Sequence, residues 1–236
     1  MRLRTGLYAV WYYGVTAVLA VLYIPLLAMP RPMVRDGVKL WARLLIWGLR
    51  VIGGVTLELR GLERLPPGPA LIAAKHQSMF DIVPAFALMP DALFVMKREL
   101  VRIPVFGWHN VKAGSIVIDR GGQAKTMRKM LHDARERFKE PRQLLIFPEG
   151  TRKKLGAEPD YKPGIAGLYR ELQVPCIPIA TNTGAHLNTA GLPTSPGVVV
   201  YEVLEPIPPG LKRVDFMRTL EERIESASQA LLQEGR

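Results

Sequence analysis

The chain has 236 residues, of which 48% are hydrophobic and 8% aromatic, a composition that excludes a wholly disordered protein. Its net charge is +11, with 32 Lys and Arg against 21 Asp and Glu, which indicates an anionic partner: a nucleic acid, an anionic membrane surface or a phosphorylated substrate. The single cysteine, Cys176, excludes an internal disulfide, and the length suits one α/β domain with an N-terminal appendage.

The basic excess is concentrated in residues 1–56, which carry seven Lys and Arg and one acidic side chain. The other 180 residues hold 25 basic and 20 acidic side chains. Apolar residues are also densest in the N-terminal segment, whereas nucleic-acid binding calls for basic groups on a polar face. The combination favours a membrane surface over nucleic acid.

Residues 7–29 form a run of 23 residues without a formal charge. As a helix this run would extend roughly 34 Å, enough to cross a hydrocarbon core of about 30 Å. Basic residues flank both ends, so the positive-inside rule gives no orientation. Prolines end the helix and permit a turn: Pro25, Pro30 and Pro32.

A second helix is predicted over residues 38–52. Lys39, Arg43 and Arg50 share one face of it and apolar residues fill the others, which is typical of an amphipathic helix at a membrane interface. The two helices fit a hairpin in one leaflet as well as a true span. A cleaved signal peptide and a buried core helix are the alternatives, and the length of the first run and the lack of a clean cleavage site disfavour the first of them. We expect residues 1–55 to anchor the protein to the cytoplasmic face of the inner membrane.

Residues 56–236 alternate short apolar runs with helical patterns, which predicts an α/β fold in which helices flank a mixed central sheet. We expect this region to be the catalytic domain. The predicted strands are residues 56–59, 70–74, 93–96, 115–118, 144–147, 176–180 and 198–204, and the predicted helices are residues 78–88, 123–138, 165–172 and 214–233.

A histidine and an aspartate five positions apart follow the second strand. His76 and Asp81 would point apart on one straight helix, so they can meet only if His76 precedes the helix and Asp81 lies in its first turn. Ser78 and Asp81 have the spacing of a capping box, which supports that arrangement. The alternative is that Asp81 only caps the helix and His76 is an ordinary loop residue.

Charged residues also follow the strand of residues 144–147. Glu149, Gly150, Thr151 and Arg152 come directly after it and suit an anion site, because Arg can fork onto phosphate and Gly lets the backbone approach. Arg120 follows the strand of residues 115–118 in the same way. Ligands bind at the carboxyl ends of strands in open α/β sheets, although solvated polar turns would look similar.

These segments together resemble the glycerolipid acyltransferase family, which includes 1-acylglycerol-3-phosphate acyltransferases. The sequence Phe-Pro-Glu-Gly-Thr-Arg at residues 147–152 matches the most diagnostic block of that family, and His76 and Asp81 match its catalytic block. Residues 114–120 and 174–179 resemble two further blocks, in the same order. Two residues depart from the pattern: Lys75 stands where Asn is common, and Lys153 where Ser often follows.

The resemblance implies transfer of a fatty acyl group from acyl-CoA or acyl carrier protein to the free hydroxyl of 1-acylglycerol-3-phosphate (lysophosphatidate), giving phosphatidate for phospholipid biosynthesis. His76 would be the general base and Asp81 would orient its ring. Arg120 would bind the acceptor phosphate, and Glu149, Gly150, Thr151 and Arg152 would shape the acceptor site. No metal-ligand cluster stands out in the sequence, so we expect neither a metal nor a bound cofactor.

Three alternatives remain. The acceptor could be glycerol 3-phosphate, an ornithine lipid or another lysophospholipid. A non-catalytic membrane lipid-binding protein is a second alternative, but it would have no need of the His76 and Asp81 pair. A nucleic-acid-binding protein is the third, and the apolar N-terminus disfavours it.

Overall fold

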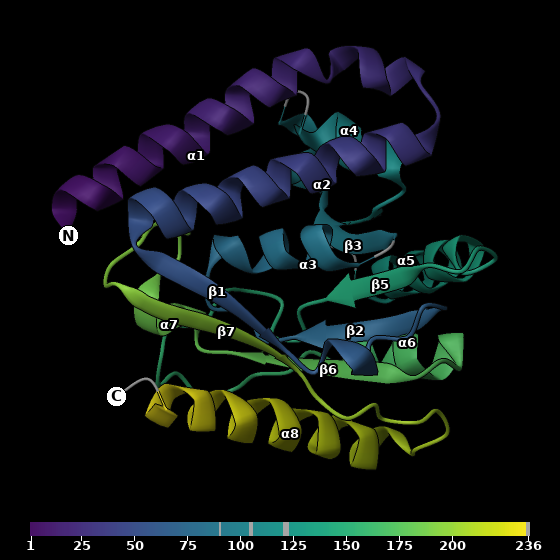
Figure 1. Cartoon of the computed structure of the whole chain (residues 1–236). Coiled ribbons are helices and arrows are strands. Elements are labelled where there is room, and N and C mark those ends of the chain that lie inside the picture. The colour runs from purple at the N-terminus through teal and green to yellow at the C-terminus, as the bar shows by residue number, and fades with distance from the viewer. Residues whose placement is uncertain (90, 104–105, 120–122, 235–236) are drawn as a thin grey trace.

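The computed structural model describes residues 1–89, 91–103, 106–119 and 123–234. Within them, seven strands form one sheet in the order β1-β7-β6-β2-β5-β3-β4, with helices on both faces (Figure 1). Neighbouring strands are parallel except β6 and β7, so the sheet is mixed, as predicted. The strands are β1 (Val55–Arg60), β2 (Ala70–Ala74), β3 (Ala92–Lys97), β4 (Ile116–Ile118), β5 (Gln143–Ile146), β6 (Cys176–Thr181) and β7 (Gly197–Val203).

The strand predictions are confirmed, and each observed end lies within one residue of the predicted one. Every residue of β2 is buried, because helices cover both faces of the sheet at its centre. Ile72 and Ala74 pack into a hydrophobic cluster on one face, while Leu71 and Ala73 pack into a second cluster on the other. The centre of the sheet therefore has a core on each side.

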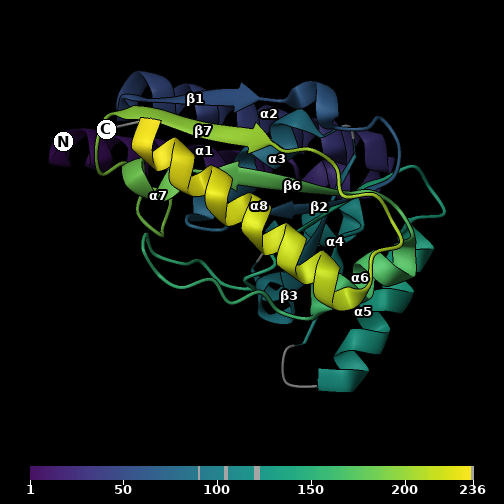
Figure 2. The ribbon, with the colours of Figure 1, turned by 90° about the horizontal axis from the view of Figure 1, so that it is seen from below.

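The helices divide between these two faces. α3 (Ile82–Leu88) packs on the first face, and α5 (Gln123–Arg137), α6 (Gly164–Leu172) and α8 (Arg213–Glu234) cover the second. Figure 2 shows α8 running obliquely across the sheet. Two short helices were not predicted, α4 (Phe106–Ala113) and α7 (Thr183–His186), because neither has a long enough apolar repeat to be recognised.

The N-terminal segment forms two helices whose bounds differ from the prediction. α1 (Arg2–Leu22) is followed by a 3₁₀ turn (Ile24–Ala28), and α2 (Arg31–Gly48) by a π-helical turn (Leu49–Gly53). Pro25 lies near the start of the 3₁₀ turn, as expected of a helix breaker. Pro32, however, lies in the first turn of α2, where its missing N–H costs nothing, so the second helix begins seven residues earlier than predicted.

α1 lies along α2, which in turn packs on α3 (Figure 1). The indole nitrogen of Trp11 donates to the carbonyl oxygen of Leu44 (3.0 Å), and that of Trp41 donates to the Thr16 hydroxyl (3.0 Å). Leu45 is fully buried in the cluster that also holds the first face of the sheet. Among the described residues, α1 is the one helix that is long and apolar enough to cross a membrane.

Candidate active site

His76 and Asp81 meet at the carboxyl end of β2. A 3₁₀ turn (Met79–Asp81) opens α3, and Ser78 caps it: the Ser78 hydroxyl accepts from the backbone N–H of Phe80 (3.3 Å). Asp81 Oδ2 accepts in return from the backbone N–H of Ser78 (2.8 Å), which confirms the predicted capping box. The cap turns the Asp81 carboxylate back toward the loop that carries His76.

The resulting contact is a hydrogen bond of 3.0 Å between His76 Nδ1 and Asp81 Oδ2. Asp81 Oδ2 also accepts from the backbone N–H of Gln77 at 2.7 Å, and the Asp81 side chain is fully buried. The His76 side chain is 15% exposed. Because Asp81 occupies Nδ1, Nε2 is the ring nitrogen that a substrate could use as a base.

Phe147 fixes the plane of the His76 ring. The two rings are stacked, with centroids 3.9 Å apart and an interplanar angle of 16°. Phe147 directly follows β5, which neighbours β2 in the sheet. The adjacency of the two parallel strands therefore brings the His76 loop and the segment of residues 147–152 together, as predicted from their place at strand ends.

Glu149 forms a hydrogen bond with the backbone of His76. It is fully buried, and its Oε1 atom accepts from the backbone N–H of His76 at 3.1 Å. Its Oε2 atom has no hydrogen-bond partner among the described residues. Burial raises the pKa of Glu149 above its ordinary value, and the nearby ammonium group of Lys75 (3.4 Å) partly offsets this effect. Glu149 thus contacts the backbone of the histidine loop.

Lys75, which stands where the family often has Asn, joins this site to the C-terminal helix. Its ammonium group lies 2.7 Å from Oε1 of Glu225 on α8, and the hydroxyl of Tyr161 donates to the same oxygen at 2.9 Å. Lys75 is nearly fully buried between Glu149 and Glu225. The departure from the family pattern therefore comes with two carboxylates that neutralise the buried ammonium group.

Three of the other predicted acceptor-site residues directly follow Glu149 in the chain. Gly150 has a φ of 66°, which lets the chain turn sharply after Glu149. Thr151 and Arg152 are exposed, and Arg152 Nη1 donates to the carbonyl oxygen of Thr189 (2.7 Å). Arg120 lies outside the described residues.

Tyr201 on β7 also contacts the site and was not predicted from the sequence. Its hydroxyl donates a 2.5 Å hydrogen bond to Asp81 Oδ1. Tyr201 lies within a strand whose apolar pattern indicates only packing, and it is 120 residues from Asp81. No local signal could have revealed this contact, because the antiparallel pairing of β6 and β7 creates it.

A cavity lies against Asp81 and Tyr201 on the first face of the sheet. Apolar side chains line nearly all of it: Leu59, Leu62, Leu65, Ala74, Pro84, Ala85, Leu88, Met89, Leu145, Ile179 and Val203. Within the described part of the chain, no three His, Cys, Asp or Glu side chains lie close enough to hold a metal ion. The site thus combines an oriented imidazole with an apolar space.

Residues 56–182 match the family model described as Acyltransferase. The chain belongs to the acyltransferase family. The matched region includes His76, Asp81 and the whole segment of residues 147–152. Tyr201 and Glu225 lie beyond its end.

Curated relatives agree with this family. The chain is 34% identical to a 1-acyl-sn-glycerol-3-phosphate acyltransferase of Pseudomonas aeruginosa, over 72% of this chain and 66% of the relative. It is 31% identical to the mouse 1-acyl-sn-glycerol-3-phosphate acyltransferase alpha, over 84% and 70% of the two chains. The human alpha protein is 30% identical, over 73% of this chain and 61% of its own length. The matched region thus spans about two thirds of these relatives.

A solved structure shows the same fold along the whole chain. The 1-acyl-sn-glycerophosphate (LPA) acyltransferase PlsC from Thermotoga maritima superposes with a TM-score of 0.80 at 22% identity. The match covers 98% of this chain and 97% of the other. The mixed sheet and its flanking helices are therefore an architecture shared with that protein.

Proposed function

We propose that this acyltransferase transfers a fatty acyl group from acyl-CoA or acyl carrier protein to the free hydroxyl of 1-acylglycerol-3-phosphate, giving phosphatidate. The observation that carries the proposal is the 3.0 Å contact of His76 Nδ1 with the buried Asp81 carboxylate. The relatives named for 1-acyl-sn-glycerol-3-phosphate support the choice of acceptor.

In the proposed reaction, Nε2 of His76 takes the proton of the acceptor hydroxyl while the hydroxyl oxygen attacks the thioester carbonyl. The tetrahedral intermediate then collapses, the carbon–sulfur bond breaks, and the imidazolium returns its proton to the departing thiolate. Asp81 keeps the ring in the tautomer whose Nε2 is unprotonated and stabilises the imidazolium. The substrate oxygen is the nucleophile, so no enzyme Ser or Cys is needed. Cys176 is fully buried, and burial raises its thiol pKa above its ordinary range.

The acceptor phosphate would bind to cationic side chains. We assign this role to Arg120, on the resemblance to the family, and to Arg152, whose guanidinium group donates to the carbonyl oxygen of Thr189. Glu149, Gly150 and Thr151 would shape the same site. Arg120→Ala should raise the Michaelis constant for the acceptor while kcat changes little.

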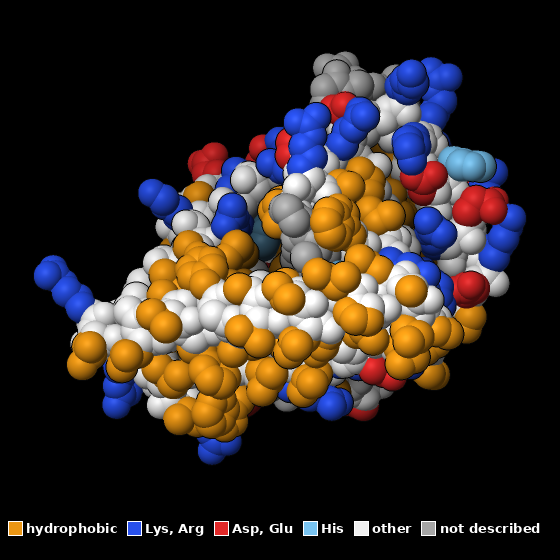
Figure 3. Space-filling model, turned by 90° about the horizontal axis from the view of Figure 1, so that it is seen from above, with side chains coloured by type: hydrophobic (Ala, Val, Ile, Leu, Met, Phe, Trp, Pro, Cys, Tyr) orange, Lys and Arg blue, Asp and Glu red, His pale blue; other side chains and the backbone are white. Residues whose placement is uncertain are grey.

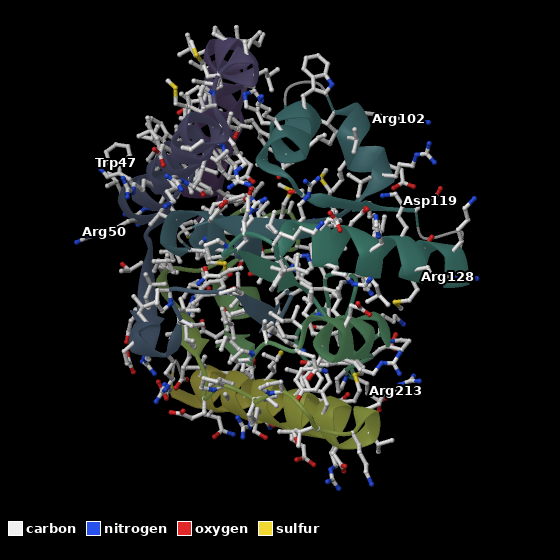
Figure 4. The ribbon with its side chains drawn as sticks, turned by 90° about the vertical axis from the view of Figure 1, so that its right-hand side faces the viewer. Trp47, Arg50, Arg102, Asp119, Arg128 and Arg213 are labelled. Carbon is white, nitrogen blue, oxygen red and sulfur yellow. The ribbon has the colours of Figure 1, made fainter. Side chains whose placement is uncertain are left out.

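A fatty substrate also suits the surroundings of the pair. The space against Asp81 is lined by apolar side chains, as a site for a fatty substrate requires, but it would have to widen to admit an acyl chain. Both candidate donors are anionic, and the net charge of +11 would attract either one. Arg102 and Arg128 point into solvent on the side of α4 and α5 (Figure 4).

The helices α1 and α2 would hold the protein in the cytoplasmic leaflet of the inner membrane. Hydrophobic side chains extend along the length of the outer face of α1, and Lys and Arg side chains surround them (Figure 3). Trp47 and Arg50 point outward near the end of α2, an aromatic and a basic residue of the kinds that anchor proteins at lipid headgroups (Figure 4). Because α1 packs lengthwise on α2, a hairpin in one leaflet fits this arrangement better than a span.

The decisive experiment incubates the purified full-length protein with lysophosphatidate and labelled acyl-CoA or acyl carrier protein. Parallel reactions contain glycerol 3-phosphate, an ornithine lipid precursor or other lysophospholipids. We expect labelled phosphatidate as the main product. Exclusive labelling of another acceptor would replace the proposed substrate, and no labelled product with any acceptor would refute the proposed transfer.

The membrane proposal has its own test. Deletion of residues 1–53 would remove Leu45 from the core and unfold the chain, so point substitutions are preferable. Val10 on α1 is 73% exposed and Val214 on α8 is 76% exposed, which makes them a matched pair. Val10→Glu should shift protein from the membrane to the soluble fraction and Val214→Glu should not. Equal membrane retention of both variants would refute an α1 anchor.

A further inference from the structure

The catalytic carboxylate has a partner outside the region that the family model matches. We propose that Tyr201 is a positioning residue that fixes the orientation and charge of Asp81 and thereby sets the pH at which His76 becomes a free base. The proposal rests on the proposed acyl transfer, since the reaction depends on a neutral imidazole. Tyr201 is almost fully buried in β7, and its hydroxyl donates to Asp81 Oδ1 at 2.5 Å.

The two oxygens of Asp81 have separate sets of partners. Oδ2 accepts from the His76 ring and from the backbone N–H groups of Gln77 and Ser78. Oδ1 accepts from Tyr201, and Asp81 borders the apolar cavity. Tyr201 therefore prevents rotation of the carboxyl group and supplies the donor that a buried carboxylate oxygen requires.

A chain of hydroxyl groups fixes the direction in which Tyr201 donates. The hydroxyls of Thr181 and Thr183 lie 2.6 Å apart, and the Thr183 hydroxyl donates to the Tyr201 oxygen at 3.2 Å. The backbone N–H of Thr183 donates to the Thr181 hydroxyl at 3.2 Å. Because its oxygen already accepts a hydrogen bond from Thr183, the Tyr201 hydroxyl donates its own hydrogen bond to Asp81.

Tyr201 remains a donor throughout the working pH range. Burial, followed by the neighbouring Asp81 charge, raises the pKa of Tyr201 well above its ordinary value, so the phenol stays protonated. The hydrogen bond from Tyr201 draws part of the negative charge of Asp81 toward Oδ1, the oxygen that does not contact His76. A carboxylate with less charge toward the ring stabilises the imidazolium less, which leaves more of the neutral base at a given pH.

Other ionisable groups near His76 are unchanged by a substitution at Tyr201. Apart from Asp81, which Tyr201 contacts directly, these groups are Lys75, Glu149 and Glu225. Lys75 precedes His76 in the same loop, Glu149 accepts from the backbone N–H of His76, and Glu225 of α8 contacts Lys75. Any change in the titration of His76 in a Tyr201 variant can therefore be assigned to the lost hydroxyl.

The test compares Tyr201→Phe with Tyr169→Phe in the full-length protein. Tyr169 is a matched control because it is also buried and its hydroxyl donates to Pro208 and accepts from the N–H of Leu211, but it lies in the cluster on the other face of the sheet. Tyr201→Phe should lower kcat about tenfold and move the acidic limb of the kcat/KM profile to higher pH by roughly half a unit. Tyr169→Phe should keep the wild-type kcat and profile.

Titration of the histidine by NMR gives a readout that does not depend on activity. The His76 resonance is assigned as the one that is missing in His76→Ala. The midpoint of its titration should move to higher pH in Tyr201→Phe and, by a smaller amount, in Thr183→Val. A wild-type midpoint in Tyr201→Phe would overturn the proposal, even if kcat fell, because the tyrosine would then act only in packing. If Tyr201→Phe does not fold, Thr183→Val decides by the same criterion. Absence of acyl transfer by the wild type would refute the proposed function alone, since the titration would still report the coupling.

Discussion

Buried charged side chains lie at both ends of the central strands, but the two clusters differ in their accessibility to solvent. At the carboxyl ends of β2 and β5 lie His76, Asp81 and Glu149. At the opposite ends, where β3 and β5 begin, Arg142 is 1% exposed and donates to Asp91 at 3.0 Å. Arg31 of α2 completes this second cluster, with a 2.9 Å bond to Asp91.

Burial of charged side chains therefore does not by itself indicate a catalytic site. Arg142 also donates to the carbonyl oxygen of Ala113 (2.7 Å), the last residue of α4. This cluster therefore joins α2 and the end of α4 to the sheet and has a structural role. At the other end, His76 is partly exposed and has one ring nitrogen that Asp81 does not occupy. An accessible proton acceptor distinguishes the candidate site.

The largest expected effect is on activity at the carboxyl end. His76→Ala should lower kcat by about a thousandfold and change the melting temperature little, because the general base is lost while Asp81 Oδ2 keeps its two backbone donors. Initial-rate measurements and a thermal scan check both parts. His132→Ala, at an exposed position on α5, is the control and should keep full activity. Retained activity in His76→Ala would end the general-base assignment.

A second prediction concerns stability at the opposite end. Arg142→Met should lower the free energy of unfolding by about 2 kcal/mol, because Asp91 loses one partner but keeps Arg31. The cost stays moderate since Nε and Nη1 of Arg142 have no hydrogen-bond partner among the described residues, and burial already lowers the pKa of Arg142. Urea unfolding in detergent measures the change, with Arg137→Met on the surface of α5 as control. A fall in kcat per folded molecule would contradict the separation of the two ends.

A smaller effect is expected from the helix cap beside the catalytic pair. Ser78→Ala should lower the free energy of unfolding by about 1 kcal/mol, because the Phe80 N–H loses its acceptor. The Asn188 carbonyl oxygen also loses a donor. Denaturant unfolding checks the value, and Ser226→Ala at an exposed position of α8 should show no comparable loss. An unchanged stability of Ser78→Ala would mean that the cap contributes nothing.

The smallest expected effect is a change in pH dependence at Glu149. Its folded-state pKa is raised, so the folded protein binds this proton more tightly than the unfolded chain does. The contribution to stability is therefore present below the unfolded pKa and is lost as the pH rises through the folded pKa. Glu149→Gln should remove this loss, and unfolding measured from acidic to neutral pH should show a flatter profile than the wild type. The effect is modest because Lys75 partly offsets the cost of burial. An identical profile in both proteins would contradict the raised pKa.

Much of the fold and part of the site could be predicted from local patterns. The apolar run of β2 gave its observed bounds, and the Ser78 and Asp81 spacing indicated the capping box that turns Asp81 toward His76. The first helix was placed too late in the chain, since hydropathy marks the uncharged run but α1 begins at Arg2. Helix α4 was missed because its short segment has no long apolar repeat.

The sequence by itself determined the strands, the cap and the pairing of His76 with Asp81, because each depends on residues within a few positions of one another. Only the tertiary structure decided that Tyr201 contacts Asp81 and that Glu225 contacts Lys75. It also decided that Glu149 binds the backbone N–H of His76 and that Arg142 pairs with Asp91 at the opposite end of the strands. These contacts join elements far apart in the chain, and strand order and helix packing create them without leaving a local pattern in the residues that take part.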